Sequence, residues 1–463
     1  MFRRVVCAGL CAYLTVVWGS VWAADQGASS ATASAAVPAV TPTAVPAYGL
    51  KPGKPYKGET IKIMAVNTPQ FVALQMRTQL FTDVTGINVK WLFVPFKPLQ
   101  EKVTSVGVAA NGNVDIVNYL DQWGASYAHW LLPLDPLVKR DNFDLTDFPA
   151  PFLQSITHDG KLYGMPMRSN VQMFLYRKDV FEALNIKPPS TWQDVIDAGP
   201  KIRAAYPDMA PLACYYGADG NRQNLFAWAD FVRGAGGAIL DAKGYPAWTS
   251  PQAMKATQEY VSLYTEHNLC GPGATSNVEQ DARISFQQGH AAMLPIWQWS
   301  YSAVTNPKDS TLKPAQVGFA PMPAYKAGDA PTTVVNTMPM SISMYSKHKE
   351  ASWEFLKWLA NPDLDKRNAI EREVNGYSVR NNVVNRWSSM QDSQVNAANS
   401  SVPAAEVKAL RGHAQPMPEV VFWPEVADLA SVAINQAVTG ADVDTVMADA
   451  AARAHRVVER ELR

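Results

Sequence analysis

The strongest constraint on the fold comes from the middle of the chain, where two strand-length segments are joined by three polar residues. Gly160 marks a hairpin-like turn, residues 163–166 are extended, and the apolar run at residues 171–176 has the length of a buried strand. Arg168-Ser169-Asn170 separates the two extended segments. The sequence therefore predicts two strands that meet at these three polar residues.

A helix and a capping motif follow this pair of strands. Residues 178–184 are predicted to form a short helix, and Pro188-Pro189 ends this part of the chain. Ser190 or Thr191 can cap the next helix, because a hydroxyl oxygen at this position accepts a hydrogen bond from a free backbone N–H group. The capped helix is predicted at residues 192–205.

The region before these strands alternates between strand and helix patterns. Strands are predicted at residues 60–66, 87–94 and 115–119, and helices at residues 71–84 and 98–110. This βαβαβ order is typical of half of a parallel sheet. The chain has 463 residues, which exceeds the size at which one hydrophobic core usually stops growing, so we expect two α/β lobes.

The N-terminal residues have the composition of an export signal. Residues 1–23 combine Arg3 and Arg4, a short apolar run and a small residue before Ala24, which predicts a cleaved signal peptide and a periplasmic protein. Residues 24–58 are rich in Ala, Pro and Thr and are predicted to form a flexible tether.

Two of the four cysteines, Cys214 and Cys270, follow the predicted signal peptide. An oxidising periplasm would allow these two residues to pair. A disulfide requires that the two Cα atoms lie close together, and the sequence gives no such distance. A bridge and a pair of free thiols are therefore both open.

Composition and motifs argue against several classes of function. Lys and Arg together number 41, as do Asp and Glu, and no basic stripe is present, so no nucleic-acid partner is expected. The sequence contains no Walker loop, no Gly-x-Ser-x-Gly and no His-Glu-x-x-His. The seven histidines do not have ligand spacing with cysteines or carboxylates, so neither a metal nor another cofactor is expected.

The order of several short motifs resembles that of family 1 extracellular solute-binding proteins, the sugar-capturing, maltose-binding-protein-like components of ABC importers. The motifs include Thr85-Gly-Ile-Asn-Val89, Asp115-Ile-Val117 and Leu131-Leu-Pro-Leu-Asp135, followed by the central strands and by residues 286–300, which end in aromatic residues. The resemblance extends from about residue 59 to the end of the chain. It implies a periplasmic-binding-protein type II fold, in which two α/β lobes are joined by three hinge crossings and enclose a ligand cleft.

The resemblance also divides the chain between the two lobes. The first lobe is expected to contain residues 59–168 and 318–375, and the second lobe residues 169–317 and 376–463. The strand at residues 317–323 would return to the first lobe, where residues 334–343 would add an antiparallel strand.

The function implied by the resemblance is transport, not catalysis. The protein would capture a sugar or polyol between its lobes, close around it and deliver it to the permease subunits of an ABC transporter in the inner membrane. It would act as a monomer, with no cofactor and no catalytic residue.

The first candidate ligand contacts follow the strand at residues 115–119, because open α/β sheets bind ligands at the carboxyl ends of their strands. Asp121 and Gln122 could bond to hydroxyl groups, and Tyr119 or Trp123 could stack on a sugar ring. The alternative is a helix N-cap beside a buried aromatic residue.

Further candidates lie at the expected crossings between the lobes. Asn170 can both donate to and accept from hydroxyl groups, whereas the neighbouring Arg168 leaves open whether the ligand is charged. The segment Asn336-Thr-Met338 departs from the Gly-Gly-aromatic pattern that the family shows at this position. It is therefore not included among the predicted contacts.

Three tryptophans complete the expected site together with several polar residues. Trp297 and Trp299 are stacking platforms or core residues, and Trp423 is a lid over the ligand or packing between the lobes. The remaining candidates are Gln223, Asn224 and Tyr377.

Two other functions are compatible with the same residues. A secreted carbohydrate-active enzyme would need two carboxylates that face each other across the cleft, and the predicted contacts supply only Asp121. A binding protein that presents its ligand to a chemoreceptor or sensor would need the same fold and the same site.

Overall fold

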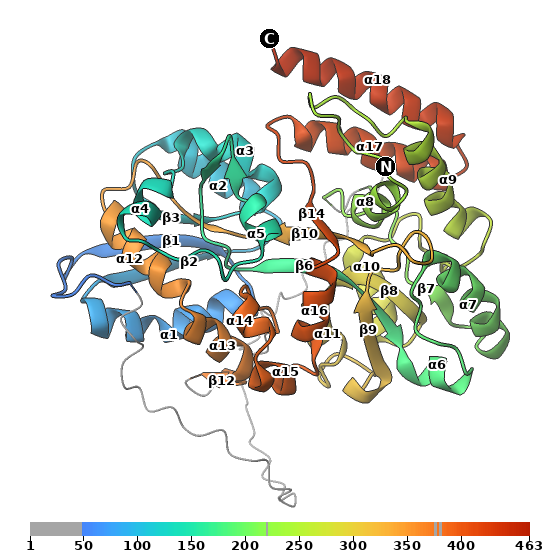
Figure 1. Ribbon diagram of the computed structural model, residues 1–463, viewed down its shortest axis with the longest axis horizontal. Coiled ribbons are helices and arrows are strands. Elements are labelled where there is room, and N and C mark those ends of the chain that lie inside the picture. Colours follow the sequence, from blue (N-terminus) through green and yellow to red (C-terminus); the bar gives the residue numbers. More distant parts are fainter. Residues whose placement is uncertain (1–48, 219–220, 375–376, 379–381) are drawn as a thin grey trace, which may run out of the picture. The chain divides into compact units, whose positions relative to one another are not determined.

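The computed structural model describes residues 49–218, 221–374, 377–378 and 382–463. The predicted signal peptide and the predicted tether up to residue 48 lie outside these residues. The described residues belong to one compact unit with two main β-sheets, each of which has its own hydrophobic core (Figure 1). We call the part built around the four-stranded sheet lobe 1 and the part built around the six-stranded sheet lobe 2.

Lobe 1 has the α/β arrangement that the sequence predicts. Its main elements are β1 (Thr60–Val66), α1 (Pro69–Thr85), β2 (Asn88–Val94), α2 (Leu99–Ala109), β3 (Ile116–Asn118), α3 (Gly124–Tyr127), α4 (Asp135–Arg140), α5 (Ala150–Gln154), the hairpin β4 (Thr157–His158) and β5 (Lys161–Leu162), β11 (Met340–Ile342) and α12 (Lys349–Leu359). The strand order is β11-β3-β1-β2, in which β1 is parallel to β2 and β3, and β11 is antiparallel to β3. In Figure 1, α1 and α2 lie on opposite sides of this sheet.

Local sequence signals explain the first helix of lobe 1. The Thr68 hydroxyl oxygen accepts a hydrogen bond from the backbone N–H of Phe71, and Pro69 occupies the first turn, where its missing N–H costs little. Gly86 ends α1 with a φ of 74°, a left-handed conformation that favours glycine. The side chains of Phe71 and Phe81 point into the core, as the apolar spacing predicts.

Lobe 2 is built around a longer sheet. Its main elements are β6 (Ser169–Arg177), α6 (Lys178–Ala183), α7 (Trp192–Ala205), β7 (Ala210–Leu212), α8 (Leu225–Gly234), α9 (Pro251–Thr265), α10 (Glu279–Gln287), β8 (Ala291–Trp297), α11 (Ser300–Val304), β9 (Val317–Pro321), β10 (Thr332–Thr337), α14 (Trp387–Met390), α15 (Ser393–Ala398), α16 (Val402–Leu410), β14 (His413–Pro416), α17 (Trp423–Val438) and α18 (Val443–Glu461). The strand order is β14-β10-β6-β8-β7, and β9 also pairs with β6. A separate two-stranded pair is formed by β12 (Glu373–Val374) and β13 (Tyr377–Ser378).

The central strand β6 pairs with three other strands. Its first three residues pair with β10, residues 172–176 pair with β8, and residues 173–177 pair with β9. The expectation that residues 317–323 return to lobe 1 is therefore wrong, because β9 belongs to the sheet of lobe 2.

The predicted strand at residues 334–343 is in fact two strands in two different sheets. Val335 in β10 lies in the core of lobe 2, whereas Met338 and Met340 lie in the core of lobe 1. Pro339 lies between the strands and has no N–H for a sheet hydrogen bond. The chain thus crosses between the lobes at residues 337–339 and not near residue 318.

The last crossing also differs from its expected place near residue 375. The helix α13 (Pro362–Ile370) follows α12, and its N-cap residue Asn361 accepts a hydrogen bond from the backbone N–H of Asp363. Leu364 packs into the core of lobe 1, whereas Ala369 packs into the core of lobe 2. The chain therefore moves from one core to the other along this helix.

The predicted tether ends earlier than residue 58. Leu50 is buried in the core of lobe 1, and the backbone N–H of Lys51 donates to Glu354 Oε2 at 2.9 Å. The Lys51 ammonium group also forms a salt bridge with Glu350 at 2.8 Å. Tyr56 also bonds to Glu350, and Gly58 bonds to Gly86, so residues 50–58 are attached to lobe 1 and a flexible tether is excluded for them.

Two further features of lobe 2 are settled by the structure. Thr191 caps α7, and the Asp194 side chain accepts a hydrogen bond from the Thr191 backbone N–H in return. Cys214 and Cys270 form a disulfide with a Cα–Cα distance of 5.5 Å. The bridge ties the segment after β7 to the segment after α9.

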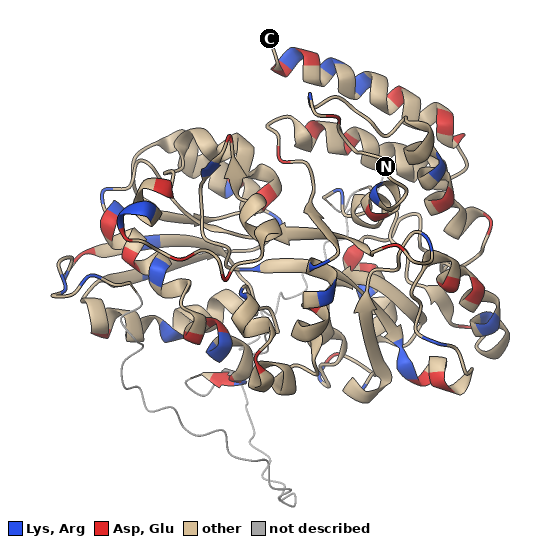
Figure 2. Cartoon of the chain, viewed as in Figure 1, with Lys and Arg blue, Asp and Glu red and all other residues tan. Residues whose placement is uncertain are grey.

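Within the described ranges, no helix combines the length and the apolar character that a membrane crossing requires. In the view of Figure 2, both acidic and basic residues occur on the helices of each lobe.

Candidate functional site

A cavity of about 720 Å³ is lined by residues of both lobes, and we call it the interlobe cleft. Its volume lies in the range of typical small-molecule sites. Seven of the predicted contact residues line it: Gln122, Trp123, Arg168, Asn170, Gln223, Trp297 and Trp299.

Lobe 1 contributes the ends of two parallel strands to the cleft. Val66 ends β1 and is followed by Asn67 and Thr68, while Leu120, Gln122 and Trp123 follow β3. Since β1 and β3 are parallel neighbours, their carboxyl ends meet at the same edge of the sheet. The prediction that Gln122 and Trp123 lie at this edge agrees with their place in the cleft lining.

Tyr119 and Asp121 lie behind the cleft wall instead of lining it. Tyr119 is buried in the core of lobe 1, where its ring contacts Tyr127 edge-on. The Asp121 carboxylate is 1% exposed and accepts hydrogen bonds at 2.6 Å from Asn336 Nδ2 and from the backbone N–H of Thr337. Burial raises the pKa of Asp121 to about 7, an effect that these hydrogen bonds oppose. Asp121 therefore holds the crossing segment in place.

The crossing segments bring two amide side chains to the cleft. Asn170 in β6 lies directly opposite Asn336 in β10, and Asn170 Nδ2 donates to Asn336 Oδ1 at 3.1 Å. The other amide atom of Asn170, Oδ1, is buried and has no hydrogen-bond partner. A ligand hydroxyl group at this position would supply the missing donor.

The two tryptophans of the motif after α10 have different surroundings. Trp297 is only 6% exposed, its ring contacts Phe226 edge-on at 4.9 Å, and its indole Nε1 donates to Glu279 Oε2 at 2.8 Å. Trp299 is only partly buried, and the guanidinium of Arg168 lies 5.5 Å from its ring centroid. Trp297 therefore belongs to both the core and the cleft wall, whereas Trp299 offers more of its surface to a ligand.

Opposite charges lie near each other in the cleft. Burial raises the pKa of Glu279 to about 7, although the hydrogen bond from Trp297 and the charges of Arg168 and Arg283 oppose this effect. Burial lowers the pKa of Arg168 to about 10, and the charge of Glu279 opposes it. Arg222 is paired with Asp428 through two contacts at 2.6 and 3.0 Å.

Besides Tyr119 and Asp121, two further predicted contacts are not part of this cleft lining. Asn224 is fully buried, and its Nδ2 donates to the carbonyl oxygens of Tyr216 and Ser431. Trp423 is 1% exposed at the start of α17 and packs in the core of lobe 2, so the lid interpretation is not supported. The side chain of Tyr377 lies outside the described part of the structure.

Several residues of the cleft were not predicted from the sequence. Glu279 and Arg283 lie one turn apart near the start of α10, and Lys97 precedes α2. Asn336 and Met338 also line the cleft, although their segment was set aside because it departs from the family pattern. The spacing of Glu279 and Arg283 places both on one helix face, but the sequence does not show what this face meets.

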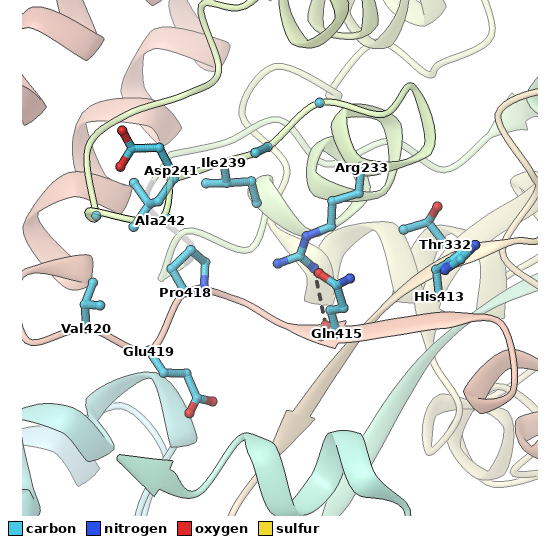
Figure 3. A pocket seen from close by; sticks show the side chains of 14 residues that line it. Arg233, Ile239, Asp241, Ala242, Thr332, His413, Gln415, Pro418, Glu419 and Val420 are labelled. Atoms are coloured by element: carbon cyan, nitrogen blue, oxygen red, sulfur yellow. Dashed lines mark hydrogen bonds between the residues drawn. The ribbon is translucent and has the colours of Figure 1, made fainter. Parts of the chain in front are cut away.

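A second cavity of about 490 Å³ lies beside β14 (Figure 3). Two of its charged groups already have partners within the chain. The Arg233 guanidinium donates to the carbonyl oxygens of Gln415 and Pro416. The Asp241 carboxylate likewise accepts from the backbone N–H groups of Lys243 and Tyr245. No aromatic residue lines this cavity, so the interlobe cleft is the better candidate site.

Across the described residues, no group of three or more His, Cys, Asp or Glu side chains is arranged to hold a metal ion.

Comparison with known proteins agrees with this geometry. Residues 64–366 match the family described as bacterial extracellular solute-binding protein. The probable amino-acid ABC transporter periplasmic-binding protein of Sinorhizobium fredii is 23% identical over 322 residues, which cover 68% of this chain and 72% of that protein. The mannitol-binding protein of Pseudomonas aeruginosa is 24% identical over 308 residues, which cover 65% of this chain and 68% of that protein.

A solved structure, that of an ABC transporter solute-binding protein from Agrobacterium radiobacter in complex with ribitol, is also similar. It shares 25% sequence identity and a TM-score of 0.73, over 87% of this chain and 99% of that chain. These matches confirm the fold class and the family that the motifs predicted. Because the family match covers more than half of the sequence, the chain belongs to the bacterial extracellular solute-binding protein family, whose members bind solutes for ABC transporters and are not enzymes.

Proposed function

We propose that this protein captures a sugar or polyol in the interlobe cleft. The main support is the lining of the cavity, which combines indole rings with amide side chains from both lobes. Indole faces suit the apolar faces of a sugar, and amide groups can both donate to and accept from hydroxyl groups. A ligand that contacts both lobes binds the closed arrangement more tightly than the open one, so it shifts the protein toward the closed arrangement.

The ligands of the relatives support the same class of solute. One relative is named as a mannitol-binding protein, and the similar solved structure contains ribitol. Both ligands are linear polyols. The amide pair formed by Asn170 and Asn336 fits such ligands, because it presents hydrogen-bonding groups without requiring a ring.

The wider role that we propose is delivery of the bound solute to a membrane permease. The protein would be exported to the periplasm through a cleaved signal peptide at residues 1–23 and would act there as a monomer. It would release its ligand to the permease subunits of an ABC transporter in the inner membrane.

A thermal-shift screen tests the ligand class. The panel contains ribitol, mannitol, maltose and neutral monosaccharides, together with amino acids as the competing class. A ligand that binds only the folded state raises the apparent Tm as its concentration increases. We expect a shift with at least one sugar or polyol, whereas a shift with amino acids alone would contradict the proposal.

A further inference from the structure

The guanidinium of Arg168 has few partners for a group with five N–H donors. Its Nη1 donates to Met338 Sδ at 3.1 Å, and its Cζ lies over the Trp299 ring, 5.5 Å from the centroid. A thioether sulfur is a weak acceptor, and a ring face takes up none of the in-plane donors. Its other N–H groups have no hydrogen-bond partner among the described residues, and Arg168 lines the cleft.

The nearby carboxylate does not pair with Arg168. Glu279 is the one carboxylate among the described residues that line the cleft, and it influences Arg168 only through space. Its Oε2 already accepts from Trp297 Nε1 at 2.8 Å and from Gln223 Nε2 at 3.4 Å. No described carboxylate forms a salt bridge with Arg168, although other arginines of the structure do have such partners.

The lining as a whole carries more basic than acidic groups. Lys97, Arg168 and Arg283 line the cleft together with Arg222, whose charge is balanced by Asp428. Lys97 is exposed to solvent, and Arg283 lies near both Glu279 and Asp309, so Arg168 is the basic group of the lining that has no described acidic partner of its own. A neutral sugar would leave the charge of Arg168 without a counter-charge in a partly buried place, which is unfavourable when the ligand also displaces water.

We propose that the ligand is a sugar or polyol that carries an anionic group, and that Arg168 binds this group while the hydroxylated part lies near Asn170 and Asn336. This inference rests on the proposed function and narrows its ligand class. The guanidinium lies between Met338 and the Trp299 ring, neither of which takes up its other N–H groups, so these could form two parallel hydrogen bonds with an anion.

A carboxylate and a phosphate monoester share the anionic oxygens that this arrangement recognises. Both accept paired hydrogen bonds from a guanidinium, and both occur on sugar skeletons. The test therefore contains both chemistries, each with a neutral partner of the same skeleton.

Isothermal titration calorimetry on the full mature chain tests the inference. The pairs are galacturonate with galactose, gluconate with sorbitol, and glucose 6-phosphate with glucose. Hydrogen bonds to charged groups are worth enough that we expect at least one anion to bind about tenfold or more tighter than its neutral partner. If every neutral partner binds as tightly as its anion, this inference is wrong and the proposed function stands. If no compound of either kind binds, this inference is wrong, and the thermal-shift screen decides the proposed function separately.

Substitutions test whether Arg168 causes the preference for the anion over its neutral partner. Arg168→Gln should remove the preference for the anion while the affinity for the neutral partner changes little, and Arg168→Lys should retain part of the preference because it keeps the charge. Arg460→Gln is the control, since Arg460 lies exposed on α18 and its loss changes the net charge equally. The Tm of each free variant verifies folding. A preference that persists in a folded Arg168→Gln protein would overturn the assignment.

Discussion

The indole Nε1 of Trp297 donates a hydrogen bond to Glu279 Oε2 at 2.8 Å, which joins the end of β8 to the first residue of α10. This bond fixes one wall of the interlobe cleft, because both residues line it. It also places a buried carboxyl group whose pKa is raised to about 7 by burial. The protein should therefore respond to pH through Glu279.

The stability of the protein should decrease between pH 5 and pH 8 because of this group. The pKa of Glu279 in the folded state, about 7, lies above the ordinary value of 4.5. In this window the folded state holds a proton that the unfolded state has lost, so raising the pH favours unfolding. The Glu279→Gln variant lacks this effect. The free energy of unfolding of Glu279→Gln minus that of the wild type should therefore increase by up to about 3 kcal/mol from pH 5 to pH 8.

Denaturant unfolding at several pH values measures this difference. Glu350→Gln is the matched control, because hydrogen bonding from Arg140 lowers the pKa of Glu350 to about 2, outside the window. If the free energies of unfolding of the wild type and Glu279→Gln changed in parallel with pH, Glu279 would have an ordinary pKa and the prediction would be wrong.

Substitution of Trp299 should affect ligand affinity more than stability. Trp299 is partly buried in the cleft wall, so Trp299→Ala should weaken binding of the best ligand by roughly 2 kcal/mol. Trp358 is 1% exposed and packs against Phe81 and Phe355 in lobe 1. Trp358→Ala should instead cost roughly 3 to 5 kcal/mol of stability, with little change in affinity. Calorimetry and thermal melts distinguish the two patterns, and a destabilised Trp299→Ala protein with normal affinity would exclude Trp299 from the site.

Trp297→Ala should combine both effects. Its ring is buried against Phe226, and its N–H group is the hydrogen-bond partner of Glu279. Truncation should lower the Tm and weaken ligand binding in the folded fraction. Trp297→Phe retains much of the packing but removes the N–H group, so it should recover more of the Tm than of the affinity. Equal recovery of both would assign Trp297 to the core alone.

Two N-terminal truncations should behave differently. Removal of residues 25–48 should leave ligand affinity and Tm unchanged, since their composition offers little apolar surface to bury. Extending the deletion to residue 58 also removes Leu50 and the contacts of Lys51 with Glu350 and Glu354, so the Tm should fall. Thermal melts of both truncated proteins test this boundary, and equal Tm values would show that residues 50–58 add no stability.

Loss of the disulfide should destabilise lobe 2. Cys214 and Cys270 are 56 residues apart in sequence, and such a cross-link typically contributes about 2 to 4 kcal/mol. The double Ser variant should unfold at lower denaturant concentration than the oxidised wild type. The wild type in reducing agent provides the comparison, and identical unfolding midpoints for oxidised and reduced protein would contradict this role.

The features that local sequence determines were predicted well. The helix α7 begins and ends where the sequence predicts, because Thr191 and Asp194 form its cap within four residues. The strand β1 is likewise predicted at its observed bounds. In both cases the determining groups are neighbours in the chain.

The features that depend on distant partners were not predicted. Nothing in residues 334–343 reveals that β10 pairs with β6 while β11 pairs with β3. Similarly, Asp121 has the residue type and position of a ligand contact, but Asn336 and Thr337 take up its carboxylate. The role of Glu279 depends on Trp297, which lies 18 residues away in sequence. These assignments required the tertiary structure.

Small-angle X-ray scattering with and without the best ligand from the thermal-shift screen tests the central claim most directly. A solute that contacts both lobes should shift the population toward the closed arrangement, and the radius of gyration should decrease at saturation. At a ligand concentration that saturates the wild type but not Trp299→Ala, the variant should show a smaller decrease. A radius of gyration that stays constant while the wild type is saturated would contradict capture by closure of the two lobes.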